Sequence, residues 1–147
     1  MNDLGRFLLA QDGTYAAALG ELRDGAKHSH SMWFIFPQIA GLGHSPTARH
    51  FAIRDLKEAR SYLTHEVLGA RLREATSATA AWTGRRSLRE IFGPLDSLKF
   101  VSCLTLFEFA AGADGAGDFS LALDALAQGA RDRHTLALIA AKDGPPG

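Results

Sequence analysis

Mostly apolar residues recur at spacings of three and four in nearly every segment of this chain. The clearest stripe runs from Leu68 through Leu72, Ala75 and Thr79 to Trp82. Such a spacing places side chains on one face of an α-helix, because a helix has about 3.6 residues per turn. The pattern predicts an all-α fold without a sheet of three or more strands.

Helix-start and helix-stop signals divide the chain into about seven or eight short helices. The start signals are Ser45-Pro46, the capping-box pair Ser87 and Glu90, Asp118 and Asp132, and the stop signals are Gly84 and Gly93-Pro94. The 147 residues fit one domain, for which about 100–200 residues is usual. We expect a compact single helical domain over residues 1–141 and a disordered tail over residues 142–147, with the glycine-rich stretch 112–117 as a flexible insertion.

Charge and hydropathy exclude several classes of protein. Sixteen basic residues balance sixteen acidic ones, so the chain lacks the broad positive field of a non-specific nucleic-acid binder, and nucleic acid is not an expected partner. No apolar run reaches the roughly 20 residues that span a bilayer, and the N-terminus lacks a secretion-signal pattern. The one cysteine, Cys103, permits no internal disulfide, fits a reducing compartment and is expected to be a small core residue. We therefore expect a cytoplasmic protein without membrane contact.

The segment HSHSMWFIFPQIAGLGHSP, residues 28–46, places the most apolar run of the chain inside a loop-like, histidine-flanked stretch. The run from Met32 to Phe36 fits either a turn of helix or an extended segment. His28 and His30 have an H-x-H spacing, which puts both imidazoles on one side of an extended chain, as in some metal sites. No H-E-x-x-H or C-x-x-C spacing supplies the remaining ligands. The sequence therefore predicts no metal site and no cofactor, with these histidines at a polar pocket rim or on the surface.

The segment DSLKFVSCLTLFEF, residues 96–109, is apolar on nearly every side and predicts the central buried helix. Asp96, Lys99, Ser102 and Thr105 follow one another at three-residue steps, so each is next to the following one on the helix surface. On so apolar a helix, a polar row must face water or a cavity. Lys99 is able to bind a phosphate or carboxylate, and Ser102 is able to add a hydroxyl hydrogen bond. The alternative is an ordinary solvent-facing stripe with Asp96 as the N-cap.

Arg85, Arg86 and Arg89 form a local basic cluster. Such a cluster contacts a phosphate in some proteins, and in others it is the solvated face of a short helix. The sequence leaves open whether these arginines contact a partner. It contains no glycine-rich phosphate loop, nucleophile elbow or dinucleotide-binding fingerprint.

Three longer runs carry a resemblance to a known family: KHSHSMWFIFPQIAGLGHSPTARHFAI, DLKEARSYLTHEVLGARLREAT and IFGPLDSLKFVSCLTLF. Together they resemble the bacterial family of domain of unknown function 1810 over roughly residues 4–140. The resemblance implies a small, compact, mostly helical cytoplasmic protein whose biochemical activity is unassigned. Some relatives carry a calpastatin-like label, but this chain is neither repetitive nor disordered in composition, so an inhibitor role is not expected.

The polar residues of these family motifs are the ones that the fold alone does not require. We expect them to line one cleft together with Trp33; they are His30, Gln38, Ser45, Lys99 and Ser102. In this hypothesis Trp33 supplies a stacking face, Gln38 supplies amide hydrogen bonds, and Lys99 contacts an anion. His30 is the candidate catalytic acid or base, because an imidazole titrates near neutral pH.

Such a cleft suits a flat, anionic small molecule, such as a nucleotide or a fragment of a nucleotide sugar. One hypothesis is an enzyme that acts on a nucleotide-like or ADP-ribose-like substrate. The other is a non-catalytic ligand-binding or protein-interaction module that uses the same cleft or the exposed aromatic residues around it. The sequence predicts neither the identity of the ligand nor the oligomeric state.

Overall fold

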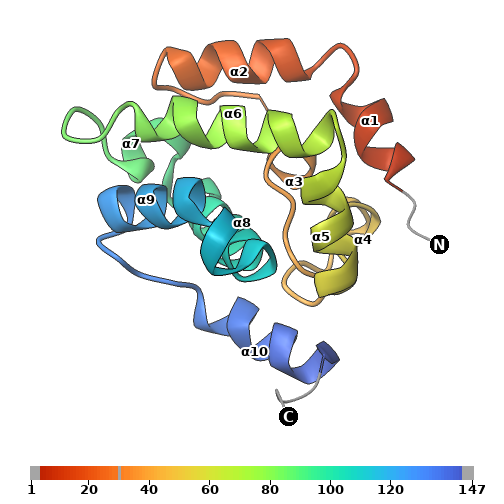
Figure 1. Cartoon of the computed structure of the whole chain (residues 1–147). Coiled ribbons are helices and arrows are strands. Elements are labelled where there is room, and N and C mark those ends of the chain that lie inside the picture. Colours follow the sequence, from red (N-terminus) through yellow and green to blue (C-terminus); the bar gives the residue numbers. More distant parts are fainter. Residues whose placement is uncertain (1–3, 30, 144–147) are drawn as a thin grey trace.

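The computed structural model describes residues 4–29 and 31–143 (Figure 1). Within these residues the chain forms ten helices and no strand, so the predicted all-α fold is confirmed. The helices are α1 (Gly5–Gln11), α2 (Tyr15–Arg23), α3 (Met32–Ile35), α4 (Pro46–His50), α5 (Leu56–Thr64), α6 (Leu68–Ala80), α7 (Leu88–Phe92), α8 (Pro94–Gly115), α9 (Gly117–Leu126) and α10 (Arg133–Asp143). Seven of them have seven or more residues, whereas α3, α4 and α7 have only four or five, too few for periodicity to reveal.

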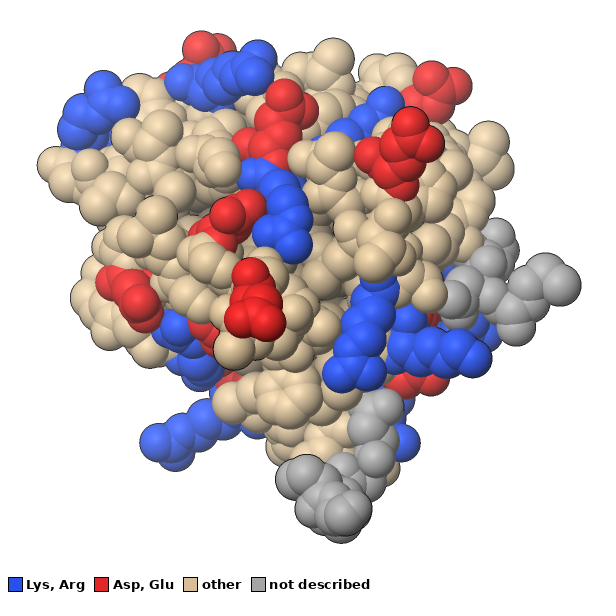
Figure 2. Space-filling view, viewed as in Figure 1, with Lys and Arg blue, Asp and Glu red and all other residues tan. Residues whose placement is uncertain are grey.

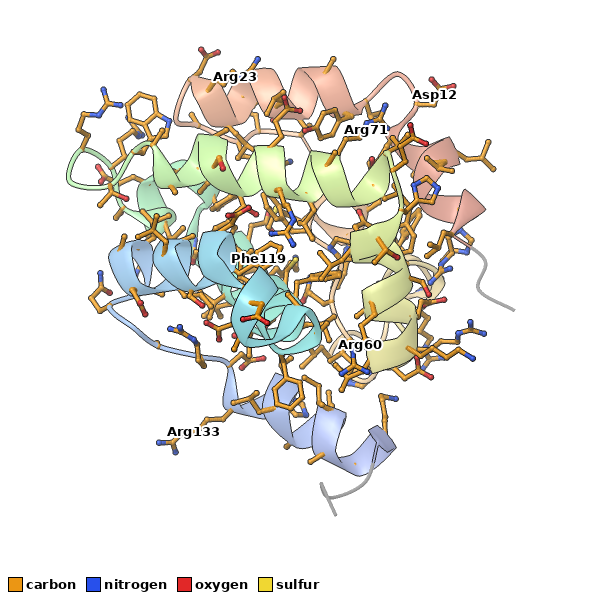
Figure 3. All side chains as sticks on the ribbon, in the orientation of Figure 1. Asp12, Arg23, Arg60, Arg71, Phe119 and Arg133 are labelled. Carbon is orange, nitrogen blue, oxygen red and sulfur yellow. The ribbon has the colours of Figure 1, made fainter. Side chains whose placement is uncertain are left out.

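Helix α8 forms the centre of the fold, with α5, α7, α9 and α10 packed against it (Figure 1). On one side of the molecule α6 lies between α2 and α9. Figure 3 shows side chains filling the space between the helices, with the buried ring of Phe119 among them. Aromatic rings link the elements of the core: Phe7 packs on Tyr62 with 5.1 Å between ring centroids, and Tyr62 packs on Phe107 at 5.3 Å. These contacts join α1, α5 and α8 in one continuous core.

Helix α8 begins before and ends after the predicted span 96–109. Gly93 is its N-cap and Pro94 its first residue, so Asp96 lies in the first turn and is not the N-cap. Gly112 has φ +73, which only glycine adopts without a steric penalty, and α8 bends there and continues to Gly115. At Gly112 the main chain leaves helical geometry, with ψ 178, and helical residues resume beyond it, so a kink between helical segments stands where the sequence predicted a flexible insertion.

The last two helices begin close to the predicted positions. Ala116 is the N-cap of α9, and Asp118 lies one residue inside its first turn. Asp132 directly precedes α10, and its carboxylate accepts a hydrogen bond from the backbone N–H of Thr135 at 3.2 Å. Asp132 therefore caps α10 in the usual way, because it satisfies a backbone donor that has no partner inside the helix.

The C-terminal boundary differs from the predicted one. Helix α10 runs to Asp143, so residues 142 and 143 are helical and do not begin a disordered tail. Lys142 in the last turn favours this continuation, because a cation interacts well with the negative end of a helix. Residues 144–147, the rest of the predicted tail, lie outside the described residues.

Helix α3 resolves the alternative left open for the apolar run at residues 32–36. Met32, Ile35 and Phe36 are buried, whereas Trp33 remains partly exposed. A single parallel bridge between Ile39 and Ile53 follows the helix. The run therefore packs into the core and leaves Trp33 at its edge.

Charged residues of both signs are interspersed on the face of the molecule that Figure 2 shows. This distribution agrees with the balanced composition of the chain. The face in Figure 2 has no broad positive surface. In the described part of the chain, no helix combines the length and the apolar character that a membrane span requires.

Candidate functional site

Two of the predicted site residues, Trp33 on α3 and Lys99 on α8, are in contact. The ammonium nitrogen of Lys99 lies 4.8 Å from the centroid of the Trp33 ring. The same nitrogen lies 3.0 Å from Oδ1 of Asp96, one turn earlier on α8. Gly43 packs against the edge of the indole so closely that a Cβ atom there would lie 2.9 Å from Cη2 of Trp33. The two sequence motifs therefore meet at Trp33, which is fixed between a glycine of the loop and α8.

The ion pair between Lys99 and Asp96 is partly open to solvent, with 27% and 30% of the two side chains exposed. An exposed ion pair contributes about 0–1 kcal/mol to stability, and an exposed cation–π contact contributes about 0.5–1 kcal/mol. Neither interaction binds Lys99 strongly. Its ammonium group is therefore available to an added anion.

A second lysine, Lys27, lies beside the end of α7, where its backbone N–H donates to the Ile91 carbonyl oxygen at 2.7 Å. Its side chain is fully buried, and its ammonium nitrogen donates to the Ser29 carbonyl oxygen at 2.6 Å and to the Ser29 hydroxyl at 3.2 Å. Oε1 of Glu21 lies 4.0 Å away and also accepts hydrogen bonds from two backbone N–H groups. Burial lowers the pKa of Lys27, while the charges of Glu21 and Asp96 act in the opposite direction.

The other residues of the predicted cleft make different contacts. Ser45 is exposed, and its hydroxyl oxygen accepts a hydrogen bond from the Ala48 N–H at 3.1 Å, which caps α4. Gln38 is 5% exposed. Its backbone carbonyl oxygen accepts a hydrogen bond from the Ile53 N–H, and its side-chain nitrogen has no hydrogen-bond partner among the described residues. His30, the candidate acid or base, lies outside the described residues. Among the described residues, Trp33 and Lys99 are in direct contact, whereas the Ser45 hydroxyl and the Gln38 main chain accept hydrogen bonds from Ala48 and Ile53.

Ser102 has a structural partner on another element. Its hydroxyl donates to Oδ2 of Asp132 at 2.9 Å, and the Thr105 hydroxyl oxygen accepts from the Asp132 backbone N–H at 3.0 Å. Asp132 is the residue that caps α10. The second half of the polar row on α8 therefore fixes the start of α10, a contact that neither the cavity nor the solvent interpretation of the row predicted.

We expect Ser102→Ala to lower the free energy of unfolding by about 1.5–3 kcal/mol, the usual contribution of a hydrogen bond to a charged acceptor. Urea unfolding measures this change, and hydrogen exchange should become faster in α10 than in α6. Ser97→Ala is the matched control, because the Ser97 hydroxyl donates only to the Pro94 carbonyl of its own helix. An unchanged midpoint of urea unfolding for Ser102→Ala would mean that α10 packs on α8 without the hydrogen bond from Ser102 to Asp132.

The described residues contain no metal-binding cluster. In residues 4–29 and 31–143, no three His, Cys, Asp or Glu side chains are close enough together to bind an ion. His28 is exposed. Cys103 is fully buried, and burial raises the pKa of its thiol well above the ordinary value, so it is the core residue that the sequence predicted.

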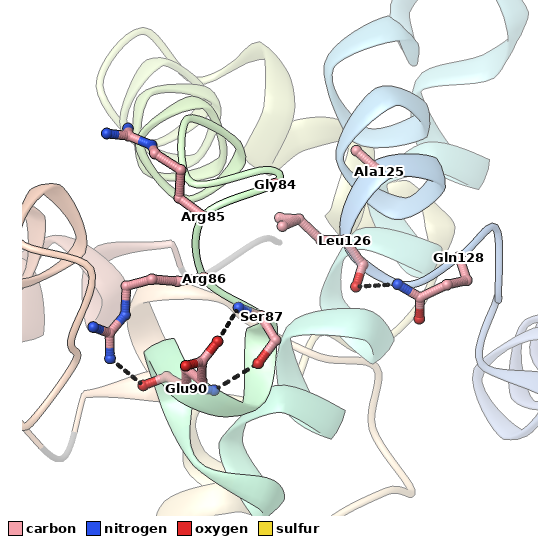
Figure 4. A pocket seen from close by; sticks show the side chains of 8 residues that line it. All are labelled: Gly84, Arg85, Arg86, Ser87, Glu90, Ala125, Leu126 and Gln128. Atoms are coloured by element: carbon pink, nitrogen blue, oxygen red, sulfur yellow. Dashed lines mark hydrogen bonds between the residues drawn. The ribbon is translucent and has the colours of Figure 1, made fainter.

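The arginines of the basic cluster do not converge. The guanidinium group of Arg85 stacks on the Trp82 ring at 4.5 Å, and Arg86 donates to the Glu90 carbonyl oxygen at 3.4 Å. A surface hollow of about 310 Å³ lies beside them, between the loop before α7 and the end of α9, and Figure 4 shows both guanidinium groups directed away from α9. Arg89 is exposed and lines the adjoining groove, not this hollow.

Comparison with known proteins gives a family and a similar fold. The model of a family described as "Protein of unknown function (DUF1810)" matches residues 1–139, a span that includes every candidate site residue. The chain is also similar to the crystal structure of the conserved hypothetical protein Rv1873 from Mycobacterium tuberculosis, with 46% sequence identity and a TM-score of 0.89. That match covers 94% of this chain and 96% of the other chain. A search of the curated proteins gave no match.

Proposed function

This chain belongs to the DUF1810 family, and from that starting point we propose that it binds a planar, anionic small molecule, such as a nucleotide, where Trp33 meets Lys99. The observation that supports the proposal is the contact of 4.8 Å between the Lys99 ammonium group and the Trp33 ring. A half-buried indole offers an aromatic surface for stacking, and the adjacent ammonium offers a charge for a phosphate or carboxylate. The two groups therefore match the two halves of such a ligand.

Asp96 occupies the place of the ligand anion in this proposal. Its carboxylate pairs with Lys99 at 3.0 Å and also acts on the charge of Lys27. A phosphate group would exchange with Asp96 at Lys99, because the exposed pair contributes only about 0–1 kcal/mol. Removal of the negative charge at Asp96 should therefore strengthen binding, whereas removal of the positive charge at Lys99 should weaken it.

The enzymatic form of the proposal adds His30 as the acid or base, since this residue lies in the sequence between Ser29 and Ser31. Ser29 and Ser31 are adjacent, with 3.2 Å between their hydroxyl oxygens, and Ser29 contacts Lys27. The non-catalytic form needs only Trp33 and Lys99. His30→Asn distinguishes the two forms, because it should abolish turnover of a substrate and preserve most of the binding affinity.

Isothermal titration with AMP tests the binding proposal directly. We expect Lys99→Ala to weaken binding by about 1–3 kcal/mol, or about 5- to 150-fold, the range for loss of a charged hydrogen bond. Asp96→Asn should strengthen binding. Lys57→Ala is the control, because Lys57 is an exposed lysine on α5 and its loss should leave the affinity unchanged.

Circular dichroism should show the same helical spectrum for all four proteins, since Lys99 and Asp96 form only an exposed pair. The absence of AMP binding to the wild-type protein, or equal affinities in Lys99→Ala and wild type, would refute the proposal for this site. Equal weakening by Lys99→Ala and Lys57→Ala would indicate non-specific attraction of the anion.

A further inference from the structure

An open groove of about 560 Å³ runs between α7, one face of α8 and the chain that joins α9 to α10. Its apolar lining consists of Leu88, Leu98, Val101, Leu126, Ala127 and Ala130. The hollow of about 310 Å³ in Figure 4 continues it, because both are lined by Ser87, Leu126 and Gln128. Neither Trp33 nor Lys99 lines this surface, so it is distinct from the site proposed for small anions.

Leu98 is the most exposed large apolar side chain of the groove, with 66% of its surface open to solvent. It lies on α8, the central helix of the fold, where the neighbouring residues Phe100 and Cys103 are fully buried. A single exposed leucine is ordinary on a protein surface, but one that lines an apolar groove can be covered by an apolar side chain of a partner.

The unpaired charge of the groove is positive. Arg89 is exposed, and its guanidinium group has no hydrogen-bond or ion-pair partner in the described part of the chain. The two carboxylates that line the groove and the adjoining hollow are already engaged: Glu90 accepts from the Ser87 N–H in the capping box, and Asp132 accepts from Ser102 and from Thr135. The groove therefore complements an acidic partner.

Gln128 is the one residue other than glycine with a positive φ in residues 4–29 and 31–143. Its φ of 54° lies at the end of α9, where the following N–H, that of Gly129, donates to the Leu123 carbonyl oxygen at 3.1 Å. Glycine is the residue that usually occupies such a helix end, because it has no Cβ. The side chain of Gln128 thus costs conformational energy, and it lines both hollows (Figure 4).

The carboxamide of Gln128 is only weakly engaged within the protein. Its nitrogen is 3.5 Å from the Leu126 carbonyl oxygen, at the upper limit of a hydrogen bond (Figure 4). A carboxamide carries one acceptor and two donors, so it can pair with both the N–H and the C=O of a peptide group. An exposed apolar side chain, an unpaired guanidinium group and a weakly engaged carboxamide along one open groove suit an extended peptide.

We propose that this groove binds an extended segment of another protein that combines acidic and apolar residues. An apolar side chain of the segment covers Leu98, a carboxylate pairs with Arg89, and a main-chain peptide group pairs with the Gln128 carboxamide. The charge of the groove selects this partner over a basic one. The proposal does not depend on the binding of small anions at Trp33.

Selection from a random peptide library displayed on phage tests the proposal, with the purified full-length chain as the target. We expect enrichment of peptides with acidic and apolar residues, and a synthetic copy of an enriched peptide should lose at least tenfold in affinity against Arg89→Ser and against Leu98→Asp. The Trp33→Ala protein, altered at the other site, should bind this peptide as the wild type does. No enrichment, or enrichment of basic peptides, would overturn the proposal. So would Arg89→Ser and Leu98→Asp proteins that bind the enriched peptide as tightly as the wild type does.

Gln128→Gly separates a binding role from a structural one. Because glycine adopts the positive φ without strain, this variant should melt at the same or a higher temperature than the wild type while it binds the enriched peptide more weakly. A lower melting temperature together with unchanged peptide binding would assign Gln128 a structural role and contradict this part of the proposal. Self-association of the chain that Leu98→Asp abolishes, without any peptide binding, would show that a second copy is the occupant instead.

Discussion

Glu58→Ala is expected to lower the free energy of unfolding by about 3–5 kcal/mol, the range for loss of one partner of a buried ion pair. The Glu58 side chain is 1% exposed, and its Oε1 lies 3.0 Å from Nη2 of Arg6, whose side chain is 11% exposed. Arg6 also donates to the carbonyl oxygens of His50 and Ala52 and thereby joins α1 to the chain around α4. Without the carboxylate, the largely buried guanidinium group of Arg6 would lose this ion pair. Urea unfolding monitored by circular dichroism measures the change.

Arg54→Ala provides the matched control, because Arg54 pairs with the same carboxylate from the surface. Its Nη2 lies 3.2 Å from Oε2 of Glu58, and its side chain is 56% exposed. Loss of such an exposed partner should cost only about 0–1 kcal/mol. Similar losses for Arg54→Ala and Glu58→Ala would show that burial of the pair does not set its importance.

Gly69→Ala should destabilise the fold by about 3 kcal/mol, at the upper end of the usual cost of overpacking. Gly69 is buried in the first turn of α6, and a Cβ atom there would lie 2.0 Å from the Leu63 carbonyl oxygen of α5. The main chains of the two helices must move apart to admit the methyl group. This cost exceeds the gain of about 1 kcal/mol that alanine normally brings to a helix interior.

Gly20→Ala is the same substitution at an open position, and it should change the stability in the opposite direction. Gly20 lies inside α2, and a Cβ atom there would meet no other atom within 4 Å. The variant should therefore be more stable than the wild type by about 0.5–1 kcal/mol. Thermal unfolding of the two glycine variants should give midpoints on opposite sides of the wild-type value, and a stabilised Gly69→Ala would contradict the close approach of α5 and α6.

The helical class of this fold was predictable because helix periodicity is a local property. The stripe from Leu68 to Trp82 corresponds closely to α6, and the capping box of Ser87 and Glu90 is present at the start of α7. The short helix α3 could not be separated from an extended segment, because four residues make about one helical turn and show no repeat of the pattern. The glycine-rich stretch 112–117 suggested a flexible insertion, because a glycine signal alone does not show that helical residues resume beyond the kink at Gly112.

The candidate site was predictable only in part. The contact of Trp33 with Lys99 agrees with the hypothesis that the two motifs share a site. From the sequence, Ser102 was assigned to the ligand, because residue spacing does not reveal a partner as distant in the chain as Asp132. Lys27 was overlooked, although it opens the KHSHSMW run, because a lysine with a fully buried ammonium group is rare and has no sequence signal of its own.

The fluorescence of Trp33 offers the most direct test of the central claim that a planar anion binds at this residue. The chain has two tryptophans, so Trp82→Phe leaves Trp33 as the single reporter. Titration of this protein with AMP should change the Trp33 emission to a saturable limit. The midpoint should move to higher AMP concentration with Lys99→Ala and to lower concentration with Asp96→Asn. An emission that AMP leaves unchanged, or a midpoint that is the same in all three proteins, would contradict the account.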